Sequence, residues 1–235
     1  MNPREHGKRV SGLFDSIAGW YDFLNHFLSA GQDLYWRHRL VRTVRPGATG
    51  RVLDLAAGTL DVSREILRRH PGQTVLALDF SQAMLCRGQA KIAESPTIIP
   101  VQADGRALPL PEACVDTVTI AFGIRNILPR NDAYREILRV LAPGGRLCIL
   151  EFGTGQARIW RGLYNFYLGT ILPQIGRFFS RDPEAYQYLA DTIRAFPDAR
   201  VLAHELLDAG FDAVSYQALS SGIVYVHVAR KPVAP

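Results

Sequence analysis

The 235-residue sequence has few cysteines, no long hydrophobic run and no strong excess of either charge. Its cysteines, Cys86, Cys114 and Cys148, lie far apart and form no C-x-x-C pair, which argues against a disulfide framework or a zinc site. An uninterrupted apolar run of about 18 residues is missing, and the polar N-terminal decapeptide lacks the apolar core of a secretory signal. These absences predict a cytoplasmic protein in a reducing compartment.

The charge balance and the spacing of the histidines argue against nucleic-acid binding and against a metal site. Lys and Arg total 27 against 22 Asp and Glu, so the net charge is only +5, which gives weak support to nucleic-acid binding, and none is expected. The six histidines do not show the spacing of metal ligands, and we therefore expect no metal.

The length suits a single domain over residues 1–235. We expect residues 1–45 to form a helical lid, because apolar residues recur there at three- and four-residue spacing. Residues 46–155 are predicted to form the ligand-binding core, 156–199 a helical insertion rich in aromatic residues, and 200–235 a final helix and hairpin.

The core alternates apolar, Val- and Leu-rich segments with amphipathic segments of about ten residues. This alternation predicts an α/β fold with a mostly parallel sheet and right-handed crossovers. The last two predicted strands are separated only by Ser220-Ser221-Gly222, which predicts an antiparallel hairpin at the end of the sheet. The other predicted strands are RVLDLAAG, TVLALD, TIIPVQA, VDTVTIAF and RLCILEF, and the helices between them are 61–70, 81–93 and 132–141.

Polar residues and glycines follow four consecutive predicted strands, where open α/β sheets bind their ligands. Each alone is also explained as a helix cap or an ordinary polar strand end. Together, acidic residues after three strands predict a ligand with a ribose and an adenine-like base. A dinucleotide is disfavoured because the first loop lacks G-x-G-x-x-G. The candidate residues are Asp54, Gly58 and Thr59 after the first strand, Asp79 after the second, Asp104 and Gly105 after the third, and Phe122 to Asn126 after the fourth.

Four separated motifs identify a family resemblance. They are YDFLNHFLSAGQDLYW at 21–36, AFGIRN at 121–126, RVLAPGGRLCILEFG at 139–153 and DPEAYQYLADTIRAFPD at 182–198. In this order they resemble the ubiquinone/menaquinone biosynthesis C-methyltransferase family, over about residues 14–230. The resemblance implies a Rossmann-like class I methyltransferase fold with seven strands. It also implies S-adenosylmethionine as cofactor, S-adenosylhomocysteine as product and a prenylated quinol as substrate, with demethylmenaquinol favoured.

The resemblance also assigns roles at the cofactor site. It implies that Thr59 lies against the cofactor, that Asp79 holds its ribose, and that Asp104 and Gly105 flank its adenine. Ala121 stands where the family has a serine that touches the cofactor site, so a hydroxyl contact is lost.

The first loop departs further from the family pattern D-x-A-G-G-T-G-D. Ala57 and Leu60 replace two glycines that let the backbone approach the ligand closely. Leu60 must either point into the sheet or crowd the methionine moiety. Two other functions stay open: methylation of another small molecule by the same fold, and, because of Leu60, a non-catalytic quinone- or lipid-binding role.

For the methyl transfer itself, Arg125 and Asn126 are the candidates that stabilise the phenolate oxygen of the quinol, and Arg125 does so by its charge. We expect Tyr21, in the first motif, to close over the substrate.

The segment 158–181 contains Arg158, Arg161, Arg177 and Arg181, interleaved with aromatic residues and without an acidic one. This composition predicts a peripheral contact with the inner face of a membrane, or a cap that forms a channel for an isoprenoid tail. A core insertion with solvent-facing arginines is the simpler alternative, and a homodimer stays open.

Overall fold

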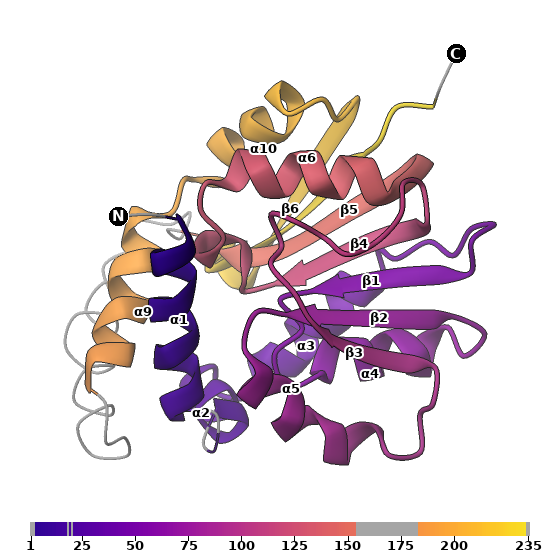
Figure 1. The fold of residues 1–235 in the computed structure, drawn as a ribbon. Helices are drawn as coiled ribbons and strands as arrows, with labels where there is room; N and C mark the ends of the chain where they lie inside the picture. The colour runs from indigo at the N-terminus through magenta and orange to yellow at the C-terminus, as the bar shows by residue number, and fades with distance from the viewer. Residues whose placement is uncertain (1–2, 18, 20, 154–182, 234–235) are drawn as a thin grey trace.

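A computed structural model describes residues 3–17, 19, 21–153 and 183–233. It contains a seven-stranded sheet with helices on both faces (Figure 1). The strands are β1 Arg51–Leu55, β2 Thr74–Asp79, β3 Ile98–Gln102, β4 Val115–Ala121, β5 Leu141–Phe152, β6 Ala213–Leu219 and β7 Val224–Arg230. The α-helices are α1 Pro3–Ile17, α2 Tyr21–Leu28, α3 Gln32–Val41, α4 Asp61–Arg69, α5 Gln82–Gln89, α6 Arg130–Val140, α9 Pro183–Ala195 and α10 Ala199–Asp208.

The strands follow the order β3-β2-β1-β4-β5-β7-β6. The first five strands pair in parallel, and β7 pairs antiparallel with both β5 and β6. The predicted fold class is therefore confirmed, including the C-terminal hairpin. Because the chain leaves β3 and returns on the other side of β1, the sheet has its switch point between β1 and β4.

The segment Pro143-Gly144-Gly145 lies just ahead of RLCILEF, the predicted fifth strand. In the structure it lies inside β5, which begins at Leu141. The register shifts from Val115↔Leu141 to Thr117↔Arg146, so the three residues form a bulge. Gly144 has a φ of 73°, which favours glycine at this position.

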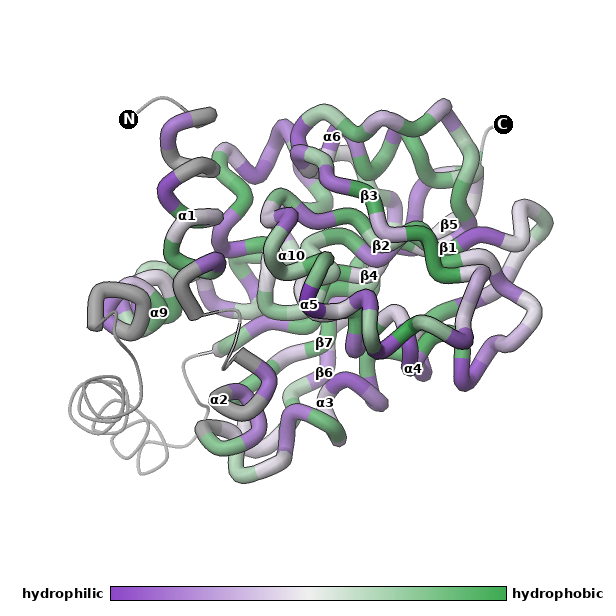
Figure 2. The backbone as a smooth tube through the Cα atoms, turned by 60° about the horizontal axis from the view of Figure 1, so that its bottom comes forward, coloured by the Kyte–Doolittle hydropathy of each residue, from purple (hydrophilic) through white to green (hydrophobic). Residues whose placement is uncertain are grey.

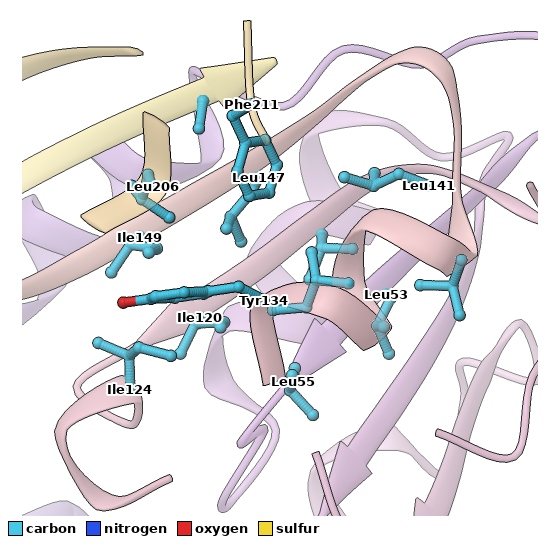
Figure 3. Packing of buried hydrophobic residues seen from close by; sticks show 14 of the residues in the cluster. Leu53, Leu55, Ile120, Ile124, Tyr134, Leu141, Leu147, Ile149, Leu206 and Phe211 are labelled. Carbon is cyan, nitrogen blue, oxygen red and sulfur yellow. The ribbon is translucent and has the colours of Figure 1, made fainter. Parts of the chain in front are cut away.

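The core forms on both faces of the sheet because its central strands are apolar on both sides. Hydrophobic stretches run along these strands, whereas α6 alternates hydrophobic and hydrophilic residues (Figure 2). The buried face of α6 places Tyr134 and Ile137 against the sheet, and the Tyr134 ring lies among side chains of β4, β5 and α10 (Figure 3). In the described ranges, every helix is too short or too polar to cross a membrane.

The structure shows that the Leu60 side chain points into the core. It precedes α4 with a φ of 67°, and its side chain is fully buried in the cluster formed with Ile66, Leu85 and their neighbours. The space is provided by α5, where a Cβ on Gly88 would lie 2.6 Å from Leu60 Cγ. The side chain points into the core, and Gly88 makes room for it.

We predict that Leu60→Ala lowers the free energy of unfolding by about 2–4 kcal/mol, because it leaves a cavity beside Gly88. Gly88→Ala should also destabilise the wild type, but less in the Leu60→Ala background, since the clash with the leucine is gone. Urea denaturation of the two single variants and the double variant measures this coupling. Gly72→Ala is the control, because a Cβ there meets no atom within 4 Å. Equal costs of Gly88→Ala in both backgrounds would contradict the packing described.

Asp54 is a carboxylate inside the sheet, 1% exposed. It accepts hydrogen bonds from the hydroxyls of Ser63, at 2.6 Å, and Thr119, at 2.8 Å. Burial raises the pKa of Asp54 to about 6, although these two hydrogen bonds oppose the shift. Asp54 therefore ties β1 to β4 and to α4.

This raised pKa predicts a pH-dependent stability. Between pH 4 and 6 the folded protein holds a proton at Asp54 that the unfolded chain has released, so stability should fall as the pH rises through this window. The loss should reach at most about 3 kcal/mol and then level off. Denaturation across this range should show a shallower decline for Asp54→Asn than for the wild type. Identical slopes would show that Asp54 is ionised without cost in the folded protein.

Candidate functional site

A cavity of about 110 Å³ lies at the carboxyl ends of β1 to β4, where the strand arrows point toward α1 and α9 (Figure 1). Its walls come from the loops after these four strands, from α5 and from α1. Eight of the predicted site residues line it: Gly58, Asp79, Asp104, Gly105, Ala121, Phe122, Gly123 and Asn126. The sequence reasoning therefore located the cavity, although it missed part of its wall.

Asp79 ends β2 and connects two loops of the site. One carboxylate oxygen accepts the backbone N–H of Gly58 at 2.8 Å, and the other accepts that of Ser81 at 2.8 Å. Burial raises the pKa of Asp79, and the nearby carboxylate of Asp15 on α1 raises it further, while the backbone N–H groups act in the opposite direction. The carboxylate keeps acceptor capacity for a ligand hydroxyl, because it has more lone pairs than these two bonds use.

Asp104 and Gly105 follow β3. The Asp104 carboxylate pairs with Arg106, whose Nη2 lies 2.6 Å from Oδ2 and whose Nε lies 2.9 Å from Oδ1. Arg106 also donates to the Leu128 carbonyl at 2.8 Å and so joins the loops after β3 and β4. A Cβ on Gly105 would approach Ile127 Cδ1 to 3.1 Å, so glycine keeps this wall open.

Thr59 does not line the cavity. It is buried, and its hydroxyl donates to Asp22 on α2 at 2.5 Å. Asp22 also pairs with Lys91 at 2.6 Å, and Lys91 reaches Asp61 on α4 at 2.7 Å. Burial raises the pKa of Asp22, but the hydrogen bonds from Lys91 and Thr59 outweigh it, so the net pKa is lowered. Thr59 thus connects the first loop to the helical N-terminal region.

Arg125 also lies behind the cavity wall, with only 4% of its side chain exposed. Its guanidinium pairs with Glu151 of β5 at 2.8 Å, donates to the carbonyl of Phe122, and lies 5.4 Å from the centre of the Phe152 ring. Burial raises the pKa of Glu151, and the charge of Arg125 opposes that shift. The Arg125 charge therefore acts on the cavity through space, or through the loop after β4, which Arg125 holds by its hydrogen bond to the Phe122 carbonyl.

Asn126 differs from Arg125 because it reaches the cavity. It ends the short 3-10 helix η2, Ile124–Asn126, in the loop that follows β4. Ala121 lines the same wall and offers only a methyl group there. Tyr21 begins α2, but its side chain lies outside the part of the structure that is described, as do residues 156–182 of the predicted insertion.

The structure therefore separates the predicted residues into two groups. Asp54, Thr59 and Arg125 lie behind the cavity wall, whereas the eight residues listed above form its surface. Among the wall residues that the sequence reasoning missed, four lie on α1 (Gly7, Val10, Ser11 and Phe14) and three follow β2 (Phe80, Ser81 and Met84). Phe80 could have been found, since it directly follows Asp79, but α1 carries no motif. Within the described ranges, His, Cys, Asp and Glu side chains form no cluster of three that could hold a metal ion.

Solved structures share this architecture at low sequence identity. The chain matches the [4+2]-cyclase SpnF with a TM-score of 0.70 and 19% identity, covering 97% of each chain. It matches phosphoethanolamine N-methyltransferase 2 of Haemonchus contortus, solved with S-adenosyl-L-methionine, with a TM-score of 0.61 and 14% identity, covering 86% of this chain and 52% of that one. At these identities the likeness shows the fold alone.

Sequence relatives are much closer. The chain is 41% identical over 231 residues to the ubiquinone/menaquinone biosynthesis C-methyltransferase UbiE of Geobacter sulfurreducens, which covers 97% of this chain and 90% of that protein. It is 42% identical over 223 residues to the demethylmenaquinone methyltransferase of Mycobacterium bovis, with 95% and 92% covered. The model of the ubiE/COQ5 methyltransferase family matches residues 3–231. The chain therefore belongs to the ubiE/COQ5 methyltransferase family.

Proposed function

We propose that this methyltransferase moves the methyl group of S-adenosylmethionine to a ring carbon of a prenylated quinol, with demethylmenaquinol as its substrate and menaquinol as its product. The names of its relatives in Geobacter sulfurreducens and Mycobacterium bovis support this chemistry. The observation that carries the proposal is that Asp79 and Asn126 line the same cavity. Asp79 can hold the ribose of the cofactor, while Asn126, on another wall of the cavity, can contact the methyl acceptor.

The residues of the cavity fit the adenosyl group. The Asp79 carboxylate can accept hydrogen bonds from ribose hydroxyls, and it is held in place by two backbone N–H groups before a ligand arrives. Apolar side chains such as Phe80 and Ile127 offer flat or branched surfaces to a base, and Gly105 leaves room beside them. Asp104 would accept from the exocyclic amine while it stays paired with Arg106.

When bound, S-adenosylmethionine supplies an electrophilic methyl group on a sulfonium. Transfer breaks the sulfur–carbon bond, forms a carbon–carbon bond to the ring and releases the ring proton. The chain's part is to hold the quinol ring in line with that methyl group and to favour loss of the quinol hydroxyl proton, because a phenolate raises electron density on the neighbouring carbon.

Asn126 and Arg125 have different roles in this proposal. Asn126 lines the cavity, so its amide can donate directly to the phenolate oxygen. Arg125 is buried against Glu151, so it contributes positive charge from behind and braces the loop through the Phe122 carbonyl. Tyr21 stays a prediction for closure over the substrate.

The non-catalytic alternative rests on Leu60, which replaces a glycine of the family pattern. Because Leu60 packs against Gly88 and does not line the cavity, it does not narrow the space for a methionine moiety. Methylation of another small acceptor is an outcome of the experiment below.

The test combines binding with product analysis. We predict that the protein binds S-adenosylhomocysteine in calorimetry and converts a demethylmenaquinol to its ring-methylated product, identified by mass spectrometry. Asp79→Asn should weaken S-adenosylhomocysteine binding about 10- to 100-fold, because it removes a charged acceptor and places an amide against backbone N–H groups. Asp116→Asn is the matched control, since Asp116 is also buried and accepts a backbone N–H, from Thr49, but lies at the other end of β4. Tight binding without methylation of any quinol would refute the proposed substrate.

We further propose that segment 158–181 makes a peripheral contact with the inner face of the membrane that holds the quinol, which also sets the protein's location. Its four arginines and its aromatic residues support this, because basic and aromatic side chains favour the interface of an anionic bilayer. A homodimer also stays a prediction. Light scattering, which measures the molecular mass in solution, would test it.

We expect the protein to sediment with phosphatidylglycerol vesicles and not with phosphatidylcholine vesicles. Replacing Arg158, Arg161, Arg177 and Arg181 with Gln should abolish this sedimentation, because each basic residue near an anionic surface adds about 1 kcal/mol. Arg68→Gln is a control at an exposed arginine on α4, outside the segment. Equal sedimentation of the wild type and the fourfold variant would show that the segment does not face the membrane.

A further inference from the structure

Tyr188 is a polar residue at the site that the mechanism above leaves unused. It lies on α9, and its partly buried hydroxyl is 3.1 Å from the Oδ1 atom of Asn126. The helix α9 runs beside α1 at the carboxyl ends of the parallel strands (Figures 1 and 2). A residue more than sixty positions away in the sequence thus holds the side chain that we propose meets the quinol oxygen.

Tyr188 donates this hydrogen bond, because the amide oxygen of Asn126 can only accept. Burial raises the pKa of its hydroxyl, while the positive charges of Arg125 and Arg9 oppose the shift, and the net pKa is raised. The hydroxyl therefore keeps its proton at neutral pH and cannot serve as the base. A protonated hydroxyl on Oδ1 leaves the Asn126 Nδ2 group, which carries two N–H donors, on the opposite side of the amide.

This orientation matters for the reaction because the two ends of an amide have opposite polarity. With Oδ1 held by Tyr188, the N–H donors of Asn126 are the groups left to meet an acceptor in the cavity, where they would stabilise an anionic phenolate. If the amide rotated by 180°, it would present its carbonyl oxygen, which repels that anion.

We infer that Tyr188 is a positioning residue, whose hydroxyl fixes the Asn126 amide so that its N–H groups face the phenolate oxygen of the acceptor. The inference rests on the proposed function and adds to it. It also gives α9 a chemical role, since docking of this helix delivers the hydroxyl.

Kinetics of Tyr188→Phe test the inference, because this change removes the hydroxyl and keeps the ring. We expect kcat to fall about tenfold, less than the loss of a direct donor, while the affinity for S-adenosylhomocysteine is unchanged. In the Asn126→Ala background, Tyr188→Phe should cause no further loss, since it acts through the missing amide. Tyr134→Phe is the matched control: it removes another buried tyrosine hydroxyl, bonded to Glu205 at 3.3 Å, and should leave kcat unchanged. Losses of kcat that multiply in the double variant would overturn the inference.

A second readout does not require turnover. The probe is 4-methoxy-1-naphthol, kept under nitrogen to prevent its oxidation, and its ionisation is followed by ultraviolet absorbance. Bound to the wild type with S-adenosylhomocysteine, its pKa should be lowered, and Tyr188→Phe should reverse part of that shift while Tyr134→Phe does not. An inactive wild type that still lowers the probe's pKa through Tyr188 would refute the proposed reaction and keep the inference. An unshifted probe, or equal shifts in the wild type and Tyr188→Phe, would overturn the inference.

Discussion

The carboxylate of Asp79 is the constraint on which the site depends. Parallel pairing of β1 with β2 brings Asp79 beside the first loop, where it accepts the N–H groups of Gly58 and Ser81. Burial disfavours its charge, and these two hydrogen bonds favour it. One side chain thus fixes two loops and still offers lone pairs to a ribose, so that the cavity has its shape before a ligand binds.

The cavity is completed by segments from both ends of the chain. The helix α1 contributes part of the wall, α2 is tied to the first loop through Asp22 and Thr59, and α9 brings Tyr188 to Asn126. Behind the wall, the Arg125–Glu151 pair braces the loop after β4. Binding of the two substrates is therefore linked to how these helices dock on the sheet.

Sequence reasoning located the fold and the cavity because both depend on local patterns. Apolar segments predicted the strands, and polar residues after consecutive strands predicted the edge where Asp79, Asp104 and Asn126 meet. It could not tell that Asp54 and Arg125 point away from the cavity, because side-chain direction at a strand end depends on tertiary partners such as Ser63 and Glu151. Nor could it choose between the two directions for Leu60, since the space beside Gly88 exists only after α5 packs.

The most direct test of this account is a crystal structure of the protein with S-adenosylhomocysteine. The account predicts that both ribose hydroxyls lie within hydrogen-bond distance of Asp79, and that this carboxylate keeps its bonds to the N–H groups of Gly58 and Ser81. The adenine should lie between the loops after β2 and β3. A ligand bound elsewhere, or an Asp79 carboxylate that leaves Gly58 and Ser81 to reach it, would contradict the claim that the site is formed in advance.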